Sequence, residues 1–144
     1  MALNINNLSS TLDLDKLSDS GESRLRDYFN EAHKELDRDL TGLWNIVPTG
    51  RYGYTLKDAD LREFIVYAIL QLLLYGGRVI EQQGSTRVYW EETRRFGATP
   101  EEIALNVVKE WNAQGEPDPE VWQSIAFAKP EWLASDANER KKRD

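Results

Sequence analysis

Residues 64–75 read FIVYAILQLLLY, a run with one polar side chain, Gln71, and the pair Gly76–Gly77 follows it directly. A helix of this length rises about 1.5 Å per residue, or about 18 Å in all, which is well short of the ~30 Å hydrocarbon core of a bilayer. A helix that is apolar on nearly every face, yet too short to cross a membrane, is typical of the centre of a soluble domain. The side chains that we expect to be almost fully buried are Phe64, Ile65, Ala68, Ile69, Leu72 and Leu73.

The composition predicts one globular domain. The chain has 144 residues, of which 40% are hydrophobic and 30% are charged, and this balance is typical of a folded protein. It has no cysteine, which excludes disulfides, thiolate metal sites and a cysteine nucleophile. Its first fifteen residues have no basic region, no long apolar stretch and no small-residue cleavage site. We therefore expect no signal peptide and a cytoplasmic location.

The charge of the chain is negative and unevenly distributed. The formal net charge is −7, and residues 13–39 hold nine acids against five bases. Residues 101–120 hold six acids against Lys109 alone, whereas the last six residues, ERKKRD, hold four bases. An acidic body repels phosphate backbones, which disfavours nucleic acid as a partner, and it attracts a protein with a basic surface. The plainer interpretation is that the acids only keep a small protein in solution.

The segments before the apolar helix predict a second helix and a short strand. Ser18 or Ser20 can cap a helix whose apolar residues recur every three or four positions until Thr41. Residues 43–47, LWNIV, favour a short strand. Thr55 followed by Asp58 resembles a capping box, which would open the apolar helix.

The segments after the apolar helix predict a hairpin and a third helix. Residues 78–82 and 86–91 read as two strands around a turn at 83–85. Thr99, followed by Pro100 and by Glu102, has the residue types of a helix cap, a first helical position and a capping box. Gly115 then follows the end of this helix.

The C-terminal part predicts one more strand and a disordered tail. Residues 124–128, SIAFA, suit a last strand, and Asp118 can cap one helical turn before it. Residues 1–17 predict a flexible arm, 18–134 a single globular domain and 135–144 a disordered charged tail. Because helices and short strands are mixed without regular alternation, we expect an α+β fold with helices packed on a small, mainly antiparallel sheet.

No constellation of residues points to catalysis or to a metal or cofactor. His33 is the one histidine, lies off the apolar stripe of its helix and is expected to be exposed. No G-x-S-x-G sequence accompanies it, and the acidic residues lack the spacing of a calcium loop. The glycines at 50 and 53 match no nucleotide fingerprint. A pair of carboxylates could hydrolyse a glycosidic bond, but 25 acids make such a pair unspecific.

Two surfaces combine arginine with aromatic residues, as interface hot spots do. The loop 48–55, PTGRYGYT, is the first, although its tyrosines could simply pack on the core. The second lies on the hairpin and just after it, where basic and aromatic residues alternate as in a site for single-stranded nucleic acid. Glu91 and Glu92 interrupt its basic character, which favours an ordinary exposed hairpin face; its residues are Arg87, Tyr89, Trp90, Arg94 and Arg95. The residues predicted to contact a partner are Arg51, Tyr52, Tyr54, Arg87, Tyr89 and Arg94.

Three functions are compatible with these patterns. The first is a small acidic, non-enzymatic protein that blocks another protein, as immunity-type proteins and phage-encoded inhibitors do. The second is a small-ligand or enzyme site between the central helix and the sheet, with Arg51, Tyr52, Arg78 and Glu81 as its polar groups. The third is a structural subunit of a homo-oligomer, such as a homodimer, which would carry a large apolar patch.

Overall fold

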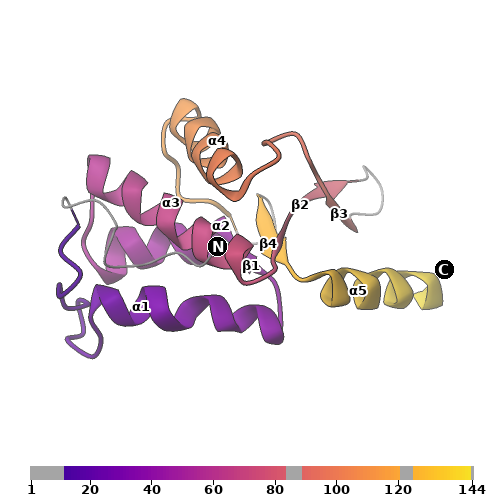
Figure 1. Cartoon of the computed structure of the whole chain (residues 1–144), viewed down its shortest axis with the longest axis horizontal. Coiled ribbons are helices and arrows are strands. Elements are labelled where there is room, and N and C mark those ends of the chain that lie inside the picture. Colours follow the sequence, from indigo (N-terminus) through magenta and orange to yellow (C-terminus); the bar gives the residue numbers. More distant parts are fainter. Residues whose placement is uncertain (1–11, 84–88, 121–124, 144) are drawn as a thin grey trace.

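The long apolar helix is the centre of the molecule, as its sequence predicts. A computed structural model describes residues 12–83, 89–120 and 125–143. In it, α3 (Asp58–Leu74) lies between α1 (Leu25–Glu31) and α4 (Pro100–Ala113), as Figure 1 shows. Together with a small antiparallel sheet these helices form an α+β fold, which confirms the predicted class. Among the described residues, no helix combines the length and the apolar character that a bilayer span needs.

The two ends of α3 differ in how well the sequence predicted them. At its C-terminal end Gly76 has a φ of +103°, and the amide of Gly77 donates to the carbonyl of Leu72 at 2.9 Å, as expected of a glycine cap. At its N-terminal end the prediction of a capping box is wrong. Lys57 precedes the first helical residue, and no side chain caps the helix. Thr55 and Asp58 instead take left-handed backbone angles, with φ of +55° and +53°.

The burial of α3 follows the prediction at five of six positions. Phe64, Ile65, Ala68, Ile69 and Leu72 are all buried. Leu73 is only partly buried, because it packs against the edge of the core and not within it.

The sheet contains four described strands in the order β1 (Thr41–Gly42), β4 (Ala126–Ala128), β2 (Arg78–Gln83) and β3 (Tyr89–Glu92). All neighbouring pairs are antiparallel. The predicted hairpin is therefore confirmed in its pairing, and most of its turn lies outside the described residues. The predicted last strand is β4, which lies between β1 and β2.

The two faces of this sheet cover different apolar clusters. Val79 and Phe127 belong to the main core with α3 and α4. Ile80, on the opposite face of β2, belongs to a smaller cluster. The other members of that cluster are Leu40, Trp44, Trp90, Ala126 and Ala128, with Trp132 and Leu133 packed against them.

The segment LWNIV forms a helix, and its prediction as a strand is wrong. α2 (Leu43–Pro48) begins after Gly42, whose amide donates to the side-chain oxygen of Asn45 at 3.0 Å. Leu43, Ile46 and Val47 recur at helical spacing and enter the main core. A short apolar run fits a strand or a buried helix equally well, and these contacts favour the helix. The chain continues without a break into η3 (Thr49–Gly53), one turn of π-helix.

The first helix is shorter than expected. It begins at Leu25, where the carboxylate of Asp27 accepts the amide of Arg24 at 2.9 Å, and it continues as the 3₁₀ segment η2 (Ala32–Asp37). Leu12, within the predicted flexible arm 1–17, has a side chain that is only 6% exposed. Residues 1–11 lie outside the described part of the chain.

The C-terminal segment forms a helix, α5 (Pro130–Arg143), which includes most of the tail predicted to be disordered. Proline at the first helical position, followed by good helix formers without an internal glycine or proline, explains the helix. Its apolar contacts come from Trp132 and Leu133, which lie near the start of the helix. α5 extends away from the body beside β3 (Figure 1).

Candidate functional sites

The loop that carries Arg51 packs on α3 and is also bonded to the turn after α4. Gly50 lies directly on Phe64 of α3, so closely that it leaves no room for a Cβ atom. Arg51 forms an ion pair with Asp118, donates to the carbonyl oxygen of Glu116 at 2.8 Å and places its guanidinium 5.6 Å from the ring centre of Trp111. The loop before α3 and the turn after α4 are therefore fixed to each other, although they are far apart in the sequence.

Tyr52 is exposed, yet its hydroxyl is fixed. Its side chain is 58% exposed, and its hydroxyl donates to Asp118 Oδ2 at 2.6 Å. This hydrogen bond, followed by those from Arg51, holds the pKa of Asp118 below its usual value. The same hydrogen bond raises the pKa of Tyr52, because the carboxylate stabilises the protonated phenol. The aromatic ring is thus presented to solvent in one orientation.

Tyr54, the third residue of this loop that was predicted to contact a partner, does not belong to the exposed surface. It is 3% exposed, and its hydroxyl donates to the carbonyl oxygen of Arg24 at 3.1 Å and lies 2.9 Å from Ser23 Oγ. Its ring packs at 6.3 Å from that of Phe64. Tyr54 therefore supports the loop from inside the molecule.

Unusual backbone geometry is concentrated around the same loop. Thr55, Asp58 and Glu116 have φ between +53° and +55°, and they are the only non-glycine residues with positive φ in the described ranges. This conformation is costly for side chains with a Cβ atom, above all for a β-branched threonine. The carbonyl oxygen of Glu116 accepts from Arg51, whereas Thr55 ends the loop 48–55 and Asp58 begins α3. Strained residues of this kind cluster at functional sites.

The surroundings of the loop are strongly acidic. The amide of Asp19 donates to the carbonyl oxygen of Gly53 at 2.6 Å, which joins the segment 13–22 to the loop. The segments 13–22, 49–60 and 116–120 together hold nine carboxylates and three basic side chains, a net charge of −6, against −7 for the whole chain. We call this region the Tyr52 corner and define it by Asp19, Arg51, Tyr52, Glu116 and Asp118.

The predicted hairpin residues do not join the Tyr52 corner. Tyr89 and Arg94 belong to β3 and the segment after it, at the end of the molecule opposite to the start of α3 (Figure 1). The side chain of Arg94 is 90% exposed, with its Nε 3.9 Å from Glu92, whereas Tyr89 is partly buried. Arg87 lies outside the described residues. The six predicted contact residues therefore form no single surface.

The pocket predicted between the central helix and the sheet is not formed by the four residues named for it. Arg51 and Tyr52 bind Asp118, whereas the guanidinium of Arg78 lies 3.9 Å from the carboxylate of Glu92. Glu81 binds Arg95 instead. His33, expected to be exposed, is partly buried with its ring 4.7 Å from that of Tyr75, and burial is the main cause that lowers its pKa.

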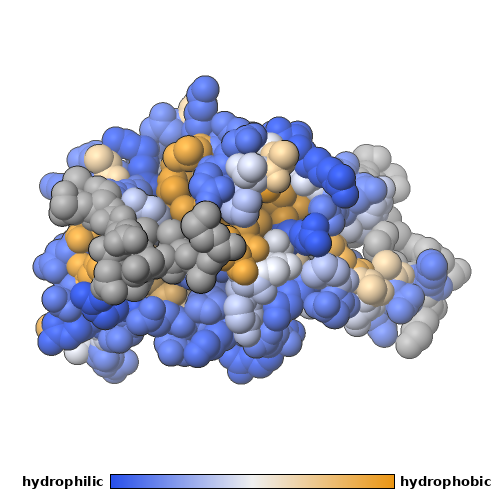
Figure 2. Space-filling view, in the orientation of Figure 1, coloured by the Kyte–Doolittle hydropathy of each residue, from blue (hydrophilic) through white to orange (hydrophobic). Residues whose placement is uncertain are grey.

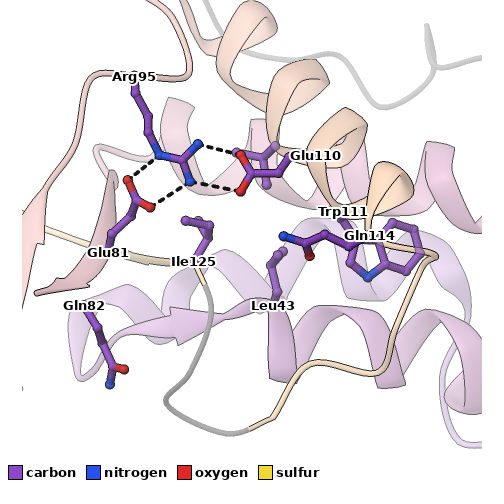
Figure 3. Close-up of a pocket in the computed structure, with 9 residues that line it drawn as sticks. Leu43, Glu81, Gln82, Arg95, Glu110, Trp111, Gln114 and Ile125 are labelled. Carbon is purple, nitrogen blue, oxygen red and sulfur yellow. Dashed lines mark hydrogen bonds and ion pairs between the residues drawn. The ribbon is translucent and has the colours of Figure 1, made fainter. Parts of the chain in front are cut away.

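A different pocket, of about 230 Å³, opens between α4 and the sheet (Figure 3). On one side of it Arg95 bridges two carboxylates. It donates to both oxygens of Glu81, each at 2.7 Å, and to both oxygens of Glu110, at 2.5 and 3.0 Å. Its guanidinium also stacks on Phe96 at 4.0 Å. The other lining residues are Leu43, Gln82, Val107, Trp111, Gln114 and Ile125.

A shallow groove of about 410 Å³ between α3 and α4 is the third surface feature. Leu105 in this groove is 58% exposed, and Val66 and Tyr67 are partly exposed. Apolar residues gather where α3 and α4 lie, while hydrophilic residues cover most of the remaining face in Figure 2. The homo-oligomer that such a patch would serve stays a prediction.

Comparison with known proteins gives no match: no family model, no curated protein and no solved structure resembles this chain. The function must therefore be inferred from the residues themselves. Sequence reasoning found Arg51 and Tyr52 but interpreted Asp118 as a helix cap. The signal that was available is the stiff turn Pro117–Asp118–Pro119, which restricts the direction of one carboxylate.

Proposed function

We propose that this protein is a non-enzymatic binding protein that acts by contact of the Tyr52 corner with another protein. The observation that carries the proposal is the exposed ring of Tyr52, fixed by Asp118 on a loop that is itself held by Arg51. Tyrosine and arginine are enriched among the residues that dominate binding energy. A side chain that is already ordered loses little conformational entropy on binding, so more of its contact energy contributes to affinity.

The strained backbone around the loop supports the same proposal. Thr55, at the end of the loop, and Glu116, whose carbonyl oxygen accepts from Arg51, both hold left-handed angles that a loop without a special geometry would avoid. Glycine would adopt these angles without strain. Threonine and glutamate adopt them at a cost in stability, and they also leave the loop less freedom to move than glycine would. Such a cost is understandable where the loop must present a side chain in one position.

The acidic surroundings favour a partner with a basic surface. Complementary charge accelerates the encounter of two proteins and selects the orientation in which they meet. The same charge repels nucleic acid. The mode of action that fits a small acidic binding protein is blockade of a basic site on the partner, as immunity-type proteins and phage-encoded inhibitors achieve.

Two matched double variants test the proposal. Arg51→Ala with Tyr52→Ala should weaken binding of a partner captured by the wild-type protein by at least ~2 kcal/mol, the usual hot-spot threshold. Arg94→Ala with Tyr89→Ala removes the same residue types from the other end of the molecule and should leave binding unchanged. Equal weakening by both variants, or weakening by the second alone, would contradict the proposal.

Three further measurements distinguish a role of the loop in binding from other causes of weaker binding. Because Arg51 also fixes the turn after α4, unfolding of each variant must be measured, and Tyr52→Ala alone should weaken binding without a large loss of stability. Affinity should fall as ionic strength rises, because exposed charges are screened. Removal of residues 139–144 should change the association rate modestly and the dissociation rate hardly at all. A truncation that abolishes binding would assign the function to α5 instead.

A further inference from the structure

The charge cluster in the pocket of Figure 3 has unused hydrogen-bond acceptors. Arg95 makes four hydrogen bonds to Glu81 and Glu110, which use four of its five N–H donors. Each of the four carboxylate oxygens accepts one of these bonds, although each has two lone pairs, and Glu81 also accepts a hydrogen bond from the side chain of Thr93. The cluster as a whole carries a charge of −1. It can therefore accept further hydrogen bonds from a cation more readily than it can donate to an anion.

Part of the remaining lining is apolar. Leu43, Val107, Trp111 and Ile125, all buried core residues, form this apolar part, and Gln82 and Gln114 are polar. Figure 3 shows Glu81, Arg95 and Glu110 on one side of the cavity, with Leu43 and Trp111 on the other. Gln114, at the C-terminal end of α4, adds an amide to the lining. A ligand that fits this arrangement has one charged end and one apolar end.

We propose that this pocket binds a small organic cation, an ammonium group attached to a compact apolar body. The ammonium would bind the outer lone pairs of Glu81 and Glu110, and the apolar body would contact Trp111 and Val107. At about 230 Å³ the pocket is smaller than the ~300–1,000 Å³ typical of drug-sized ligands, so the ligand is correspondingly small. The inference is independent of the protein-binding proposal, because no residue of the charge cluster belongs to the Tyr52 corner.

The ionisation of Glu81 and the exposure of both carboxylates suit them to this role. The hydrogen bonds from Arg95 hold the pKa of Glu81 below its ordinary value, so this carboxylate stays ionised. The side chains of Glu81 and Glu110 are 20% and 37% exposed, which leaves them accessible to a ligand and still partly shielded from competing water.

A series of three matched probes tests the charge preference on the wild-type protein. Phenylethylammonium, phenylethanol and phenylpropionate share an aromatic body and differ in the charge of the polar end. In NMR titrations the ammonium should give saturable shifts of backbone amides at Val107, Trp111 and Gln114, with an affinity at least ~10-fold higher than that of the carboxylate, since a pair of opposite charges replaces a pair of like charges. Equal affinity for all three probes, or no saturable shift with the ammonium, would overturn the proposal.

Three variants locate the site. Glu110→Gln removes one negative charge and should weaken ammonium binding at least ~5-fold, since the cluster becomes neutral. Gln114 is exposed at the end of α4, so a large side chain there does not disturb the core. Gln114→Trp should therefore fill part of the cavity and block ammonium binding. Glu102→Gln, an exposed acid at the other end of α4, is the matched control and should bind the probe as the wild type does. Unchanged binding by Glu110→Gln and Gln114→Trp would place any ammonium site elsewhere and refute the assignment.

Discussion

Two glycines of the loop before α3 provide a matched pair for a test of its packing. Gly50 and Gly53 are three residues apart, but a Cβ atom would meet very different surroundings at each. At Gly50 it would lie 2.5 and 2.8 Å from two ring atoms of Phe64 and 2.9 Å from Leu61 Cδ1. At Gly53 its nearest neighbour is Thr49 Cγ2, at 3.7 Å, an ordinary contact.

The magnitude follows from what can move at each position. Phe64 and Leu61 are 0% and 2% exposed and lie in the main core, so neither can turn away into solvent. Gly50→Ala should therefore cost ~1–3 kcal/mol, as overpacking of a well-packed core does. Gly53→Ala should be neutral or stabilising by up to ~1 kcal/mol, because alanine restricts the unfolded chain more than glycine does.

Chemical denaturation of both variants gives the required free energies of unfolding. The expected difference between the two substitutions is at least ~1 kcal/mol, since only Gly50→Ala should destabilise the protein. Equal midpoints and equal slopes would refute the reasoning, because they would mean that the loop does not rest on α3 as described. Since Gly50 adjoins Arg51, Gly50→Ala should also displace the loop and weaken partner binding.

Three further predictions concern the core, a helix cap and a carboxylate. Ile69→Ala should cost ~2–5 kcal/mol of unfolding free energy, whereas Leu73→Ala, at a partly buried position, should cost clearly less; a loss below about 1 kcal/mol for Ile69 would mean that α3 is misplaced. Thr99→Ala should cost ~0.5–2 kcal/mol, because the amide of Glu102 loses the oxygen that now accepts it at 3.2 Å, and an unchanged denaturation midpoint would show another acceptor. The pKa of Asp118 is lowered on folding, so its contribution to stability is present above the ordinary value of 3.8 and is lost as the pH falls through the lower pKa of the folded state. Asp118→Asn should move the pKa of the Tyr52 phenol back towards its ordinary value of 10.0, which NMR of labelled tyrosine can follow, and a phenol that titrates alike in both proteins would show that the hydrogen bond does not form in solution.

The parts of the fold that the sequence predicted are those with a local physical cause. Gly76 ends α3 because the end of a helix commonly needs positive φ, and Thr99 caps α4 because its side chain reaches an amide three residues away. The apolar run forms the centre of the core because no other environment accepts it. These causes act within a few residues, so the sequence alone contains them.

The parts of the fold that could not be predicted from the sequence depend on contacts between distant segments. Residues 43–47 form a helix because three of their side chains enter the main core, and residues 135–143 are helical as part of a helix anchored at Trp132. The candidate sites show the same limit. Arg51 could be chosen as a candidate by its type, but its partner Asp118 is 67 residues away, and no pattern in a single sequence joins the two.

Hydrogen–deuterium exchange of the chain, with and without a captured partner, tests the central claim most directly, because it maps the contact surface without any substitution. The Tyr52 corner predicts that the partner slows exchange in three separate segments, residues 17–20, 50–55 and 115–120, which the fold brings together. Protection confined to the hairpin and the segment after it, residues 78–98, or to α5, would contradict the claim that this corner is the binding site.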